Sequence, residues 1–359
     1  MDNYSLCFHD LSIGYTEKGS EKCLARGLNG YLMRSALTCL TGLNGSGKST
    51  LLRTMDGFQK PLRGSVLLNG INITAYPLKE IAQHISIVLT EKIPCEALTV
   101  FDIVSMGRLP YTGHFGKLSA SDKAIVTNAL EKVGLTAFSR RRFYELSDGE
   151  RQKVLIAKAI AQETPIILLD EPTAYLDYPS KIAMMLLLHR LAKALKKTIF
   201  MSTHDLEHAL QVADQVWLID HEKGLTTGMP EDLSIDGSIE RYFAKENMMF
   251  DRESCTFSIE YETARDIIVE GKEDTLEYRL CCKALLRNGM KPVSKTEESN
   301  ASTDVTLKIP GDGTYRLIEK GRETVKVEKM AHLLHMIVPA ITKYHISAIR
   351  EAAEMNQYE

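Results

Sequence analysis

The amino-acid sequence predicts an α/β fold whose core is a mostly parallel sheet. Short apolar runs alternate with helix-like segments over the first two thirds of the chain. Several of these runs are continuously apolar, which is typical of strands buried on both faces of a sheet. A glycine-rich loop, Gly42–Thr50, follows one such run and precedes a helix-like segment. The chain has 359 residues, which is enough for two domains.

The expected elements of the first two thirds follow one another in order. The strand-like runs are Ser5–Gly14, Ala36–Thr41, Ser65–Leu68, Ile85–Leu89, Pro165–Leu169, Thr198–Ser202 and Gln215–Ile219. The helix-like segments are Lys48–Asp56, Val100–Met106, Ser121–Val133, Glu150–Ala161, Ser180–Ala194 and Leu206–Ala213. The stretch from about Phe101 to Phe143 holds no strand-like run, so we expect a helical insert there.

The sequence becomes more polar after about Phe250, and we expect a small separate α+β domain there. We place the first domain at residues 1–248 and the accessory domain at 249–359. The expected elements of the second are a βαβ-like piece (Asp266–Val269, Thr275–Arg287, Lys291–Val293), a polar loop (Ser294–Ser302), a hairpin (Val305–Ile309, Thr314–Ile318) and an amphipathic helix (Val327–Ile337).

Composition excludes several classes of protein. Apolar residues make up 44% of the chain and charged residues 25%, as in globular rather than disordered proteins. The longest near-continuous apolar run, Ile182–Leu188, is far shorter than the ~20 residues of a membrane-spanning helix. The start of the sequence lacks the layout of a signal peptide, and the net charge of −3 does not favour a nucleic-acid partner. The seven cysteines contain no CxxC pair, which favours free thiols in a reduced setting.

The glycine-rich loop matches the phosphate-binding pattern G-x-x-x-x-G-K-[ST]. Its glycines let consecutive N–H groups point at phosphate oxygens, and the following helix adds its positive end. The pattern predicts that Lys48 reaches the β- and γ-phosphates and that the Ser49 hydroxyl contacts Mg²⁺. The expected binding residues are Gly42, Asn44, Gly45, Ser46, Gly47, Lys48, Ser49 and Thr50.

Two carboxylates follow an apolar run at Asp170 and Glu171. The tip of a strand beside a phosphate loop is where α/β sheets bind ligands. We therefore expect Asp170 to hold Mg²⁺, directly or through water, and Glu171 to orient and polarise an attacking water. An ordinary strand end is the alternative, but it becomes less favoured after a phosphate loop.

Between these motifs, Leu146–Gln152 (LSDGERQ) resembles the LSGGQ signature of ATP-binding-cassette (ABC) ATPases. The order of the motifs matches that family over roughly residues 4–245. The resemblance implies an ABC-type fold with an N-terminal antiparallel β part and a helical subdomain at about 92–162. It also implies adenine stacking by Tyr15, a D-loop containing Asp177, and a switch histidine, His204, that touches the γ-phosphate.

The same resemblance implies a head-to-tail homodimer that binds ATP and Mg²⁺. Each ATP would lie between the phosphate loop of one subunit and Ser147–Gly149 of the other, with Ser147 and Gly149 as contacts. A helix that begins near Gly149 would offer its N–H groups to the γ-phosphate. The expected catalytic residues are Glu171, His204 and Lys48.

Two positions depart from the family pattern. Asp148 stands where the family has glycine, and a carboxylate near a triphosphate is unfavourable unless it points away or meets a basic partner. Arg140–Arg142 are close in sequence, although a solvated loop face is the simpler reading. The family's Q-loop glutamine is also missing, and Thr90 followed by Glu91 stands there instead. We expect Thr90 to substitute for it at Mg²⁺ or the water, with Glu91 as the alternative.

The chain resembles the ATP-hydrolysing subunits of importers. It has one cassette and no coiled-coil insert. The segment Leu98–Tyr111 is similar to a segment of ATPases that serve iron-siderophore, haem and cobalamin importers. The segment Ala161–Thr164 fits the same group of ATPases. The implied partners are a separate membrane permease dimer and, indirectly, a substrate-binding protein, with the chain at the cytoplasmic face of the inner membrane of a bacterium. The alternatives are a zinc or manganese importer ATPase and a soluble ATPase with a regulatory tail.

Two patterns resemble metal sites. His204 and His208 lie four residues apart, but the zinc motif's glutamate is missing. His332, His335 and the adjacent pair Cys281–Cys282 are read as helix-face histidines and buried thiols, with a metal sensor as the alternative.

Overall fold

The computed structural model describes residues 4–17, 20–89, 97–112, 116–294, 305–319 and 322–337. The chain divides into two compact units, one comprising Met1–Lys245 with Met249–Ser258 and the other Glu246–Met248 with Ile259–Glu359. The hairpin of β11 (Met248–Asp251) and β12 (Thr256–Ile259) thus belongs largely to the first unit, whose core Phe250 and Phe257 contact. None of the described helices is both long and apolar enough to span a bilayer.

The first unit is built on a six-stranded sheet in the order β10-β9-β3-β8-β7-β6. Its parallel strands are β3 (Leu37–Thr41), β6 (Ile85–Val88), β7 (Ile166–Leu169), β8 (Thr198–Ser202) and β9 (Gln215–Asp220), and β10 (Gly224–Gly228) is an antiparallel edge. Every residue of β3, β7 and β8 is buried. The α/β fold with a mostly parallel core sheet is therefore confirmed.

A second sheet, in the order β2-β1-β4-β5, is antiparallel. It contains β1 (Tyr4–Glu17), β2 (Ser20–Met33), β4 (Arg63–Leu68) and β5 (Ile71–Asn72). Strand β2 was not predicted because it contains two glycines and no clear alternation. One of them, Gly30, lies where a Cβ would come within 2.8 Å of the Phe8 ring, which packs edge-on against Trp217.

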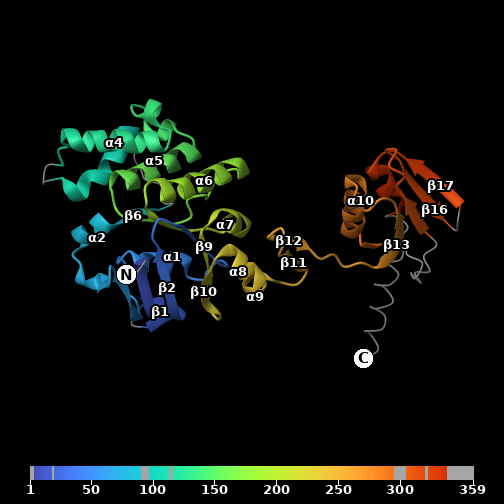
Figure 1. The fold of residues 1–359 in the computed structure, drawn as a ribbon, viewed down its shortest axis with the longest axis horizontal. Helices are drawn as coiled ribbons and strands as arrows, with labels where there is room; N and C mark the ends of the chain where they lie inside the picture. Colours follow the sequence, from blue (N-terminus) through green and yellow to red (C-terminus); the bar gives the residue numbers. More distant parts are fainter. Residues whose placement is uncertain are drawn as a thin grey trace. The chain divides into compact units, whose positions relative to one another are not determined.

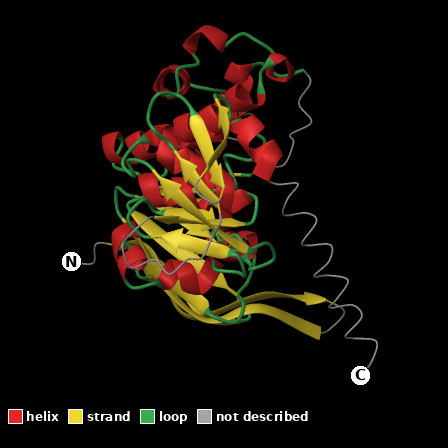
Figure 2. Cartoon of the chain, turned by 90° about the vertical axis from the view of Figure 1, so that its right-hand side faces the viewer, coloured by secondary structure: helices red, strands yellow, loops and turns green. Residues whose placement is uncertain are grey.

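The helices of the first unit lie around the six-stranded sheet or, in the insert, on the helices that cover it (Figures 1 and 2). They are α1 (Lys48–Met55), α2 (Leu78–His84), α3 (Val100–Ser105), α4 (Ala120–Lys132), α5 (Asp148–Ala161), α6 (Tyr178–Ala194), α7 (Leu206–Val212), α8 (Pro230–Ile235) and α9 (Ser238–Phe243). The short helices α2, α8 and α9 were not predicted.

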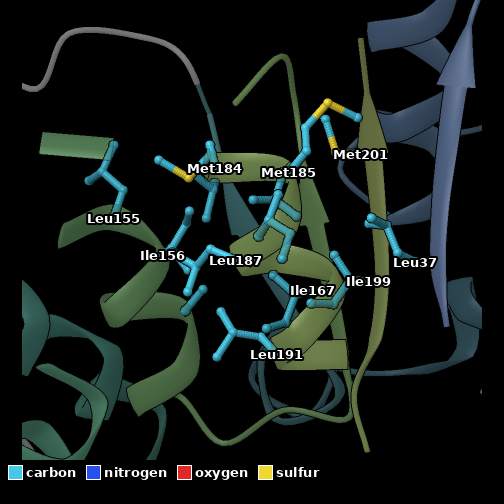
Figure 3. Close-up of a cluster of buried hydrophobic side chains, with 14 of the residues drawn as sticks. Leu37, Leu155, Ile156, Ile167, Met184, Met185, Leu187, Leu191, Ile199 and Met201 are labelled. Carbon is cyan, nitrogen blue, oxygen red and sulfur yellow. The ribbon is translucent and has the colours of Figure 1, made fainter. Parts of the chain in front are cut away.

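The expected helical insert is present. Helices α3 and α4 begin with capping boxes at Thr99 and Ser119, in which the cap hydroxyl and an acidic side chain three residues later satisfy the free N–H groups. Both pack against α5, whose Leu155 and Ile156 lie in the same apolar cluster as side chains of α6 and the core strands (Figure 3). The insert and the sheet therefore share one continuous core through α5.

The second unit contains a five-stranded sheet and the helix α10 (Leu276–Arg287). Strand β13 (Arg265–Glu270) pairs in parallel with β14 (Met290–Ser294) and β15 (Val305–Lys308), and β16 (Tyr315–Glu319) and β17 (Arg322–Val327) continue the sheet in antiparallel fashion. The βαβ piece and the hairpin are confirmed. The expected helix from Val327 is wrong at its start, because that residue ends β17 and the helical residues are 330–337. Most of the expected polar loop lies outside the described residues.

Two leucines of α6 test the burial of this core with the same chemical change. Leu188 is fully buried, whereas Leu186 is 46% exposed. We expect Leu188→Ala to lower the free energy of unfolding of the first unit by about 2–5 kcal/mol, because it removes contacts and leaves a cavity. Leu186→Ala should change it by less than about 0.5 kcal/mol. Urea denaturation followed by circular dichroism measures both, and equal effects would contradict the packing described here.

Candidate functional site

The glycine-rich loop joins β3 to α1. Gly45 and Gly47 have φ angles of 80° and 97°, in the region that glycine adopts without strain. A Cβ at Gly42 would lie 2.3 Å from the carbonyl oxygen of Ile219, so only glycine fits there. Within the described part of the chain, the buried hydroxyl of Ser46 has no hydrogen-bond partner. The loop thus combines a tight backbone with a polar group that a phosphate oxygen could satisfy.

Lys48 is buried at the start of α1. Its Nζ donates hydrogen bonds to the carbonyl oxygens of Gly42, at 2.9 Å, and Leu43, at 3.2 Å. Burial lowers the pKa of Lys48, while the nearby charges of Glu171 and Asp170 act in the opposite direction. The loop therefore holds one cation close to the two carboxylates.

Asp170 follows β7 and is anchored by hydroxyls from two other elements. Its Oδ1 accepts hydrogen bonds from Ser202 Oγ, at 2.6 Å, and from Ser49 Oγ, at 3.2 Å. The Ser202 hydroxyl in turn accepts a hydrogen bond from the backbone N–H of Glu171, at 2.9 Å. Ser202 was not singled out as a site residue. A single hydroxyl at the end of the buried run of β8 is the one signal that could have identified it.

Glu171 and His204 lie next to each other. The Nε2 atom of His204 contacts Oε1 of Glu171, and both side chains are partly exposed. Glu171 has a φ of 47°, an unusual conformation for a residue other than glycine. Such strain is found where the surroundings impose a geometry, and here Ser202 bonds the backbone of Glu171 while His204 contacts its carboxylate.

Ser147 caps α5, the fourteen-residue helix that follows the signature. Its Oγ accepts from the N–H of Glu150, and the Glu150 carboxylate accepts from both the N–H and the hydroxyl of Ser147, at 2.9 Å each. Hydrogen bonds from Ser147 lower the pKa of Glu150. A Cβ at Gly149 would meet only Leu176 at 3.8 Å, so the first turn of the helix is open to a ligand.

Asp148 is paired with Arg151, at 3.3 Å, within the same helix. The guanidinium of Arg151 also donates to the carbonyl oxygens of Tyr144, at 2.7 Å, and Phe143, at 3.3 Å. The basic partner of Asp148 is thus Arg151 rather than Arg140–Arg142. The carboxylate remains largely exposed, so the ion pair is weak.

Tyr15 and Asp177 lie on other elements. Tyr15 is part of β1 and is partly exposed, with Lys22 Nζ 5.5 Å from the centre of its ring. Asp177 caps α6 by accepting from the N–H of Ser180, at 2.8 Å, which lowers the pKa of Asp177. Thr90 and Glu91 lie outside the described residues, so the role of Thr90 stays a prediction.

The structure brings only some of the expected residues together. Hydrogen bonds and contacts join Ser49, Asp170, Glu171 and His204, and Lys48 lies close enough for its pKa to respond. In the described ranges, no contact links Ser147, Gly149 or Asp177 to that network. The arrangement offers a cradle for phosphates, hard oxygen donors for a divalent cation, and a carboxylate that could accept a proton from water.

The histidine pair four residues apart does not converge. His204 contacts Glu171, whereas His208 is buried and its ring packs 4.9 Å from that of Tyr178.

Burial raises the pKa of Cys281, in the second unit, to about 12. Among the described residues, no group of three or more His, Cys, Asp or Glu side chains is arranged to hold a metal ion.

Comparisons with known proteins agree on one family. The ABC transporter family pattern matches residues 25–174. An uncharacterised ABC transporter ATP-binding protein of Methanocaldococcus jannaschii is 41% identical, covering 62% of this chain and 76% of that protein. The iron(3+)-hydroxamate import ATP-binding protein FhuC of Bacillus subtilis is 40% identical over 57% of this chain and 75% of that protein. The ferric enterobactin transport ATP-binding protein FepC of Escherichia coli is 33% identical over 67% and 88%.

Solved structures show the same fold. An inward-facing structure described as a metal-chelate type ABC transporter is 28% identical, with a TM-score of 0.58, and covers 71% of this chain and 96% of that one. A dimeric bacterial ABC transporter cassette is 25% identical, with a TM-score of 0.53. The match covers 60% of this chain and 94% of that chain.

Removal of the Ser202 hydroxyl tests the network around the carboxylates. We expect Ser202→Ala to lower the rate of ATP hydrolysis about tenfold or more, because Asp170 loses a donor and the N–H of Glu171 loses its acceptor. The matched control is Ser234→Ala, which removes an equally buried hydroxyl that donates to Pro230 O in α8. Steady-state phosphate release measures both variants. Equal rates in Ser202→Ala and the unmodified chain would show that this hydrogen bond does not position the carboxylates.

Proposed function

Since the chain belongs to the ABC transporter family of ATP-binding proteins, we propose that it powers an importer of iron–siderophore complexes through a separate membrane permease. It hydrolyses ATP. The observation that carries the proposal is the network of Ser49, Asp170, Glu171 and His204 beside the phosphate loop, taken together with the transported compounds in the names of FhuC and FepC. These names favour iron–siderophore transport over a zinc or manganese importer or a soluble non-transport ATPase.

The phosphate loop binds the triphosphate of ATP in this proposal. The N–H groups of Gly45–Ser49 and the start of α1 surround the phosphate oxygens, with Gly42, Asn44 and Thr50 completing the loop. The Lys48 ammonium exchanges its carbonyl partners for the β- and γ-phosphates. Tyr15, partly exposed on β1, stacks on the adenine.

The donor set around Asp170 fits Mg²⁺. The Ser49 hydroxyl and the Asp170 carboxylate are hard oxygen ligands, and their hydrogen bond shows that both reach one point. Bound Mg²⁺ would neutralise charge on the phosphate oxygens. Few protein ligands are needed, because Mg²⁺ keeps several waters and takes phosphate oxygens as well.

Hydrolysis follows from the positions of Glu171 and His204. The Glu171 carboxylate orients a water for in-line attack on the γ-phosphorus and polarises its O–H bond. His204, in contact with that carboxylate, donates from its ring to a γ-phosphate oxygen. From β8, Ser202 holds the Asp170 carboxylate and the backbone of Glu171.

A homodimer completes the ATP site in this proposal. Ser147 and Gly149 lie at the exposed start of α5, where the free N–H groups and the helix dipole favour an anion. They would contact the γ-phosphate bound by a second copy, with Asp177 at the same interface. The dimeric arrangement of a related cassette supports this assembly.

A groove of about 810 Å³ supports docking of the permease. It lies between α1, α2 and α5, with Ile81 and Leu155 among its lining residues. Phe58 and Leu78, which also line it, are 77% and 72% exposed. Such an apolar groove suits an amphipathic cytoplasmic segment of a permease, which would hold the chain at the cytoplasmic face of the cell membrane. A substrate-binding protein would act on the other side.

Replacement of the general base tests the mechanism and the dimer together. We expect Glu171→Gln to bind ATP but to hydrolyse it at least about a hundredfold more slowly, so that ATP-bound dimers accumulate. Size-exclusion chromatography with light scattering measures the dimer, and Glu231→Gln, on the exposed side of α8, is the control. Rapid hydrolysis by Glu171→Gln would contradict the assignment.

Uptake by a deletion strain tests the transported compound. A strain that lacks this chain should lose uptake of a labelled ferric siderophore, and the unmodified gene should restore it. A plasmid with Glu171→Gln should not, because transport needs hydrolysis. Haem, cobalamin, zinc and manganese are the comparison substrates. Loss of uptake of one of these alone would replace the iron–siderophore proposal, and unchanged uptake of all would refute the importer function.

A further inference from the structure

Two sequence segments about fifty residues apart meet at the end of α5. They are Gly107–Tyr111, in the short 3-10 helix of the insert, and Ala161–Thr164, between α5 and β7. The Arg108 guanidinium donates from Nη1 to Ala161 O and to Glu163 Oε2, at 2.8 Å each. The Tyr111 hydroxyl donates to Gln162 O, at 2.9 Å. We call Ala161–Thr164 the joint.

The approach on the insert side is close. A Cβ at Gly107 would lie 2.3 Å from Lys158 O, so only glycine allows this contact with α5. Arg108 is buried, donates from Nε to Asp122 at the start of α4, at 2.9 Å, and stacks 4.3 Å from the centre of the Tyr111 ring. One buried guanidinium thus ties α4 and the 3-10 helix to the joint, and its two carboxylate partners offset the cost of burial.

On the other side, the joint forms hydrogen bonds with α2, β6 and β7. Gln162 Nε2 donates to Ala82 O in α2, at 2.6 Å, and to Ile85 O in β6, at 3.2 Å. The buried Thr164 hydroxyl donates to Ile166 O, at 2.9 Å, and lies 3.0 Å from Ser86 Oγ. The joint therefore connects the insert to the strands that end at the ATP site.

The backbone of the joint is itself strained. Glu163 has a φ of 56°, in the left-handed region that residues with a Cβ avoid. The ion pair with Arg108 holds this side chain, so a tertiary contact stabilises the sharp turn from α5 into β7. A helix end held in this way has one defined direction.

Because α5 is a rigid helix, its direction at the joint determines the position of Ser147 at its other end. The fourteen residues of α5 span about 20 Å, with the joint at one end and Ser147 at the other. A tilt of about 10° at the joint would therefore move Ser147 by about 3.5 Å, more than a hydrogen bond tolerates.

We propose that Arg108, Tyr111 and Gln162 are positioning residues that set the direction of α5 and so place Ser147 and Gly149 against the ATP of a second copy. The second half of this statement rests on the proposed homodimer. The first half concerns the single chain and can be measured in the monomer.

Spin labels on non-natural residues at Tyr144 and His9 measure the direction of α5. Both side chains are exposed, one beside the start of α5 and the other on β1. We expect Gln162→Leu and Arg108→Lys to broaden or shift the distance distribution by about 3 Å or more, because each removes hydrogen bonds of the joint. Tyr111→Phe, which removes one hydroxyl, should give a smaller change. The control Tyr242→Phe removes a hydroxyl bonded to Thr226, at 2.9 Å, and should change nothing.

Dimer formation gives the functional readout. In a Glu171→Gln background, Gln162→Leu should weaken ATP-driven dimerisation about tenfold or more, while the affinity of the monomer for MgATP changes less than about twofold. An unchanged label distance in folded Gln162→Leu and Arg108→Lys would overturn the proposal. So would a shifted distance with unchanged dimerisation. If the Glu171→Gln parent itself forms no dimer, the placement against a second copy is refuted together with the proposed homodimer, and the label distances still decide the role of the joint.

Discussion

The candidate site depends on the register of three neighbouring parallel strands. Leu40 of β3 pairs with Ser202 of β8, and Leu169 of β7 pairs with Met201. This register places Ser202 beside Asp170, where its hydroxyl reaches both the carboxylate and the N–H of Glu171. Because side chains alternate along a strand, a shift of one residue would turn the hydroxyl to the opposite face. The phosphate loop, the two carboxylates and the histidine therefore share one edge only while this register holds.

The same sheet also supports helix α5, which extends away from that edge. Helix α5 starts at the signature and packs its apolar face into the core that β7 and α6 share (Figure 3). Its far end is held by a buried arginine with two carboxylate partners and by a glutamine bonded to α2 and β6. Removing one partner of a buried ion pair is costly, because it leaves a buried charge without compensation. The Gly-Arg-Leu-Pro-Tyr segment that resembles importer ATPases thus bonds directly to the end of α5.

Local patterns in the sequence predict the elements that the structure confirms. The continuous apolar strands, the phosphate loop, Asp170 and Glu171 could be predicted because each consists of neighbouring residues with an unusual composition. Strand β2 could not be predicted, since Gly30 weakens its pattern for a tertiary reason, the close approach of Phe8 and Trp217. Val327 was expected in a helix, but pairing with Tyr315 makes it the end of β17.

The sequence by itself determined the family and the fold class of the first unit, and it supplied the residues that we propose for the ATP site. These depend on short motifs whose spacing along the chain is visible without coordinates. Only the tertiary structure decided that Ser202 bonds both the Asp170 carboxylate and the backbone N–H of Glu171, that Arg151 is the partner of Asp148, and that Arg108 and Gln162 hold the end of α5. The hydrogen bonds of Ser202, Arg108 and Gln162 join elements that are distant in sequence. Such bonds leave no periodic pattern in either segment.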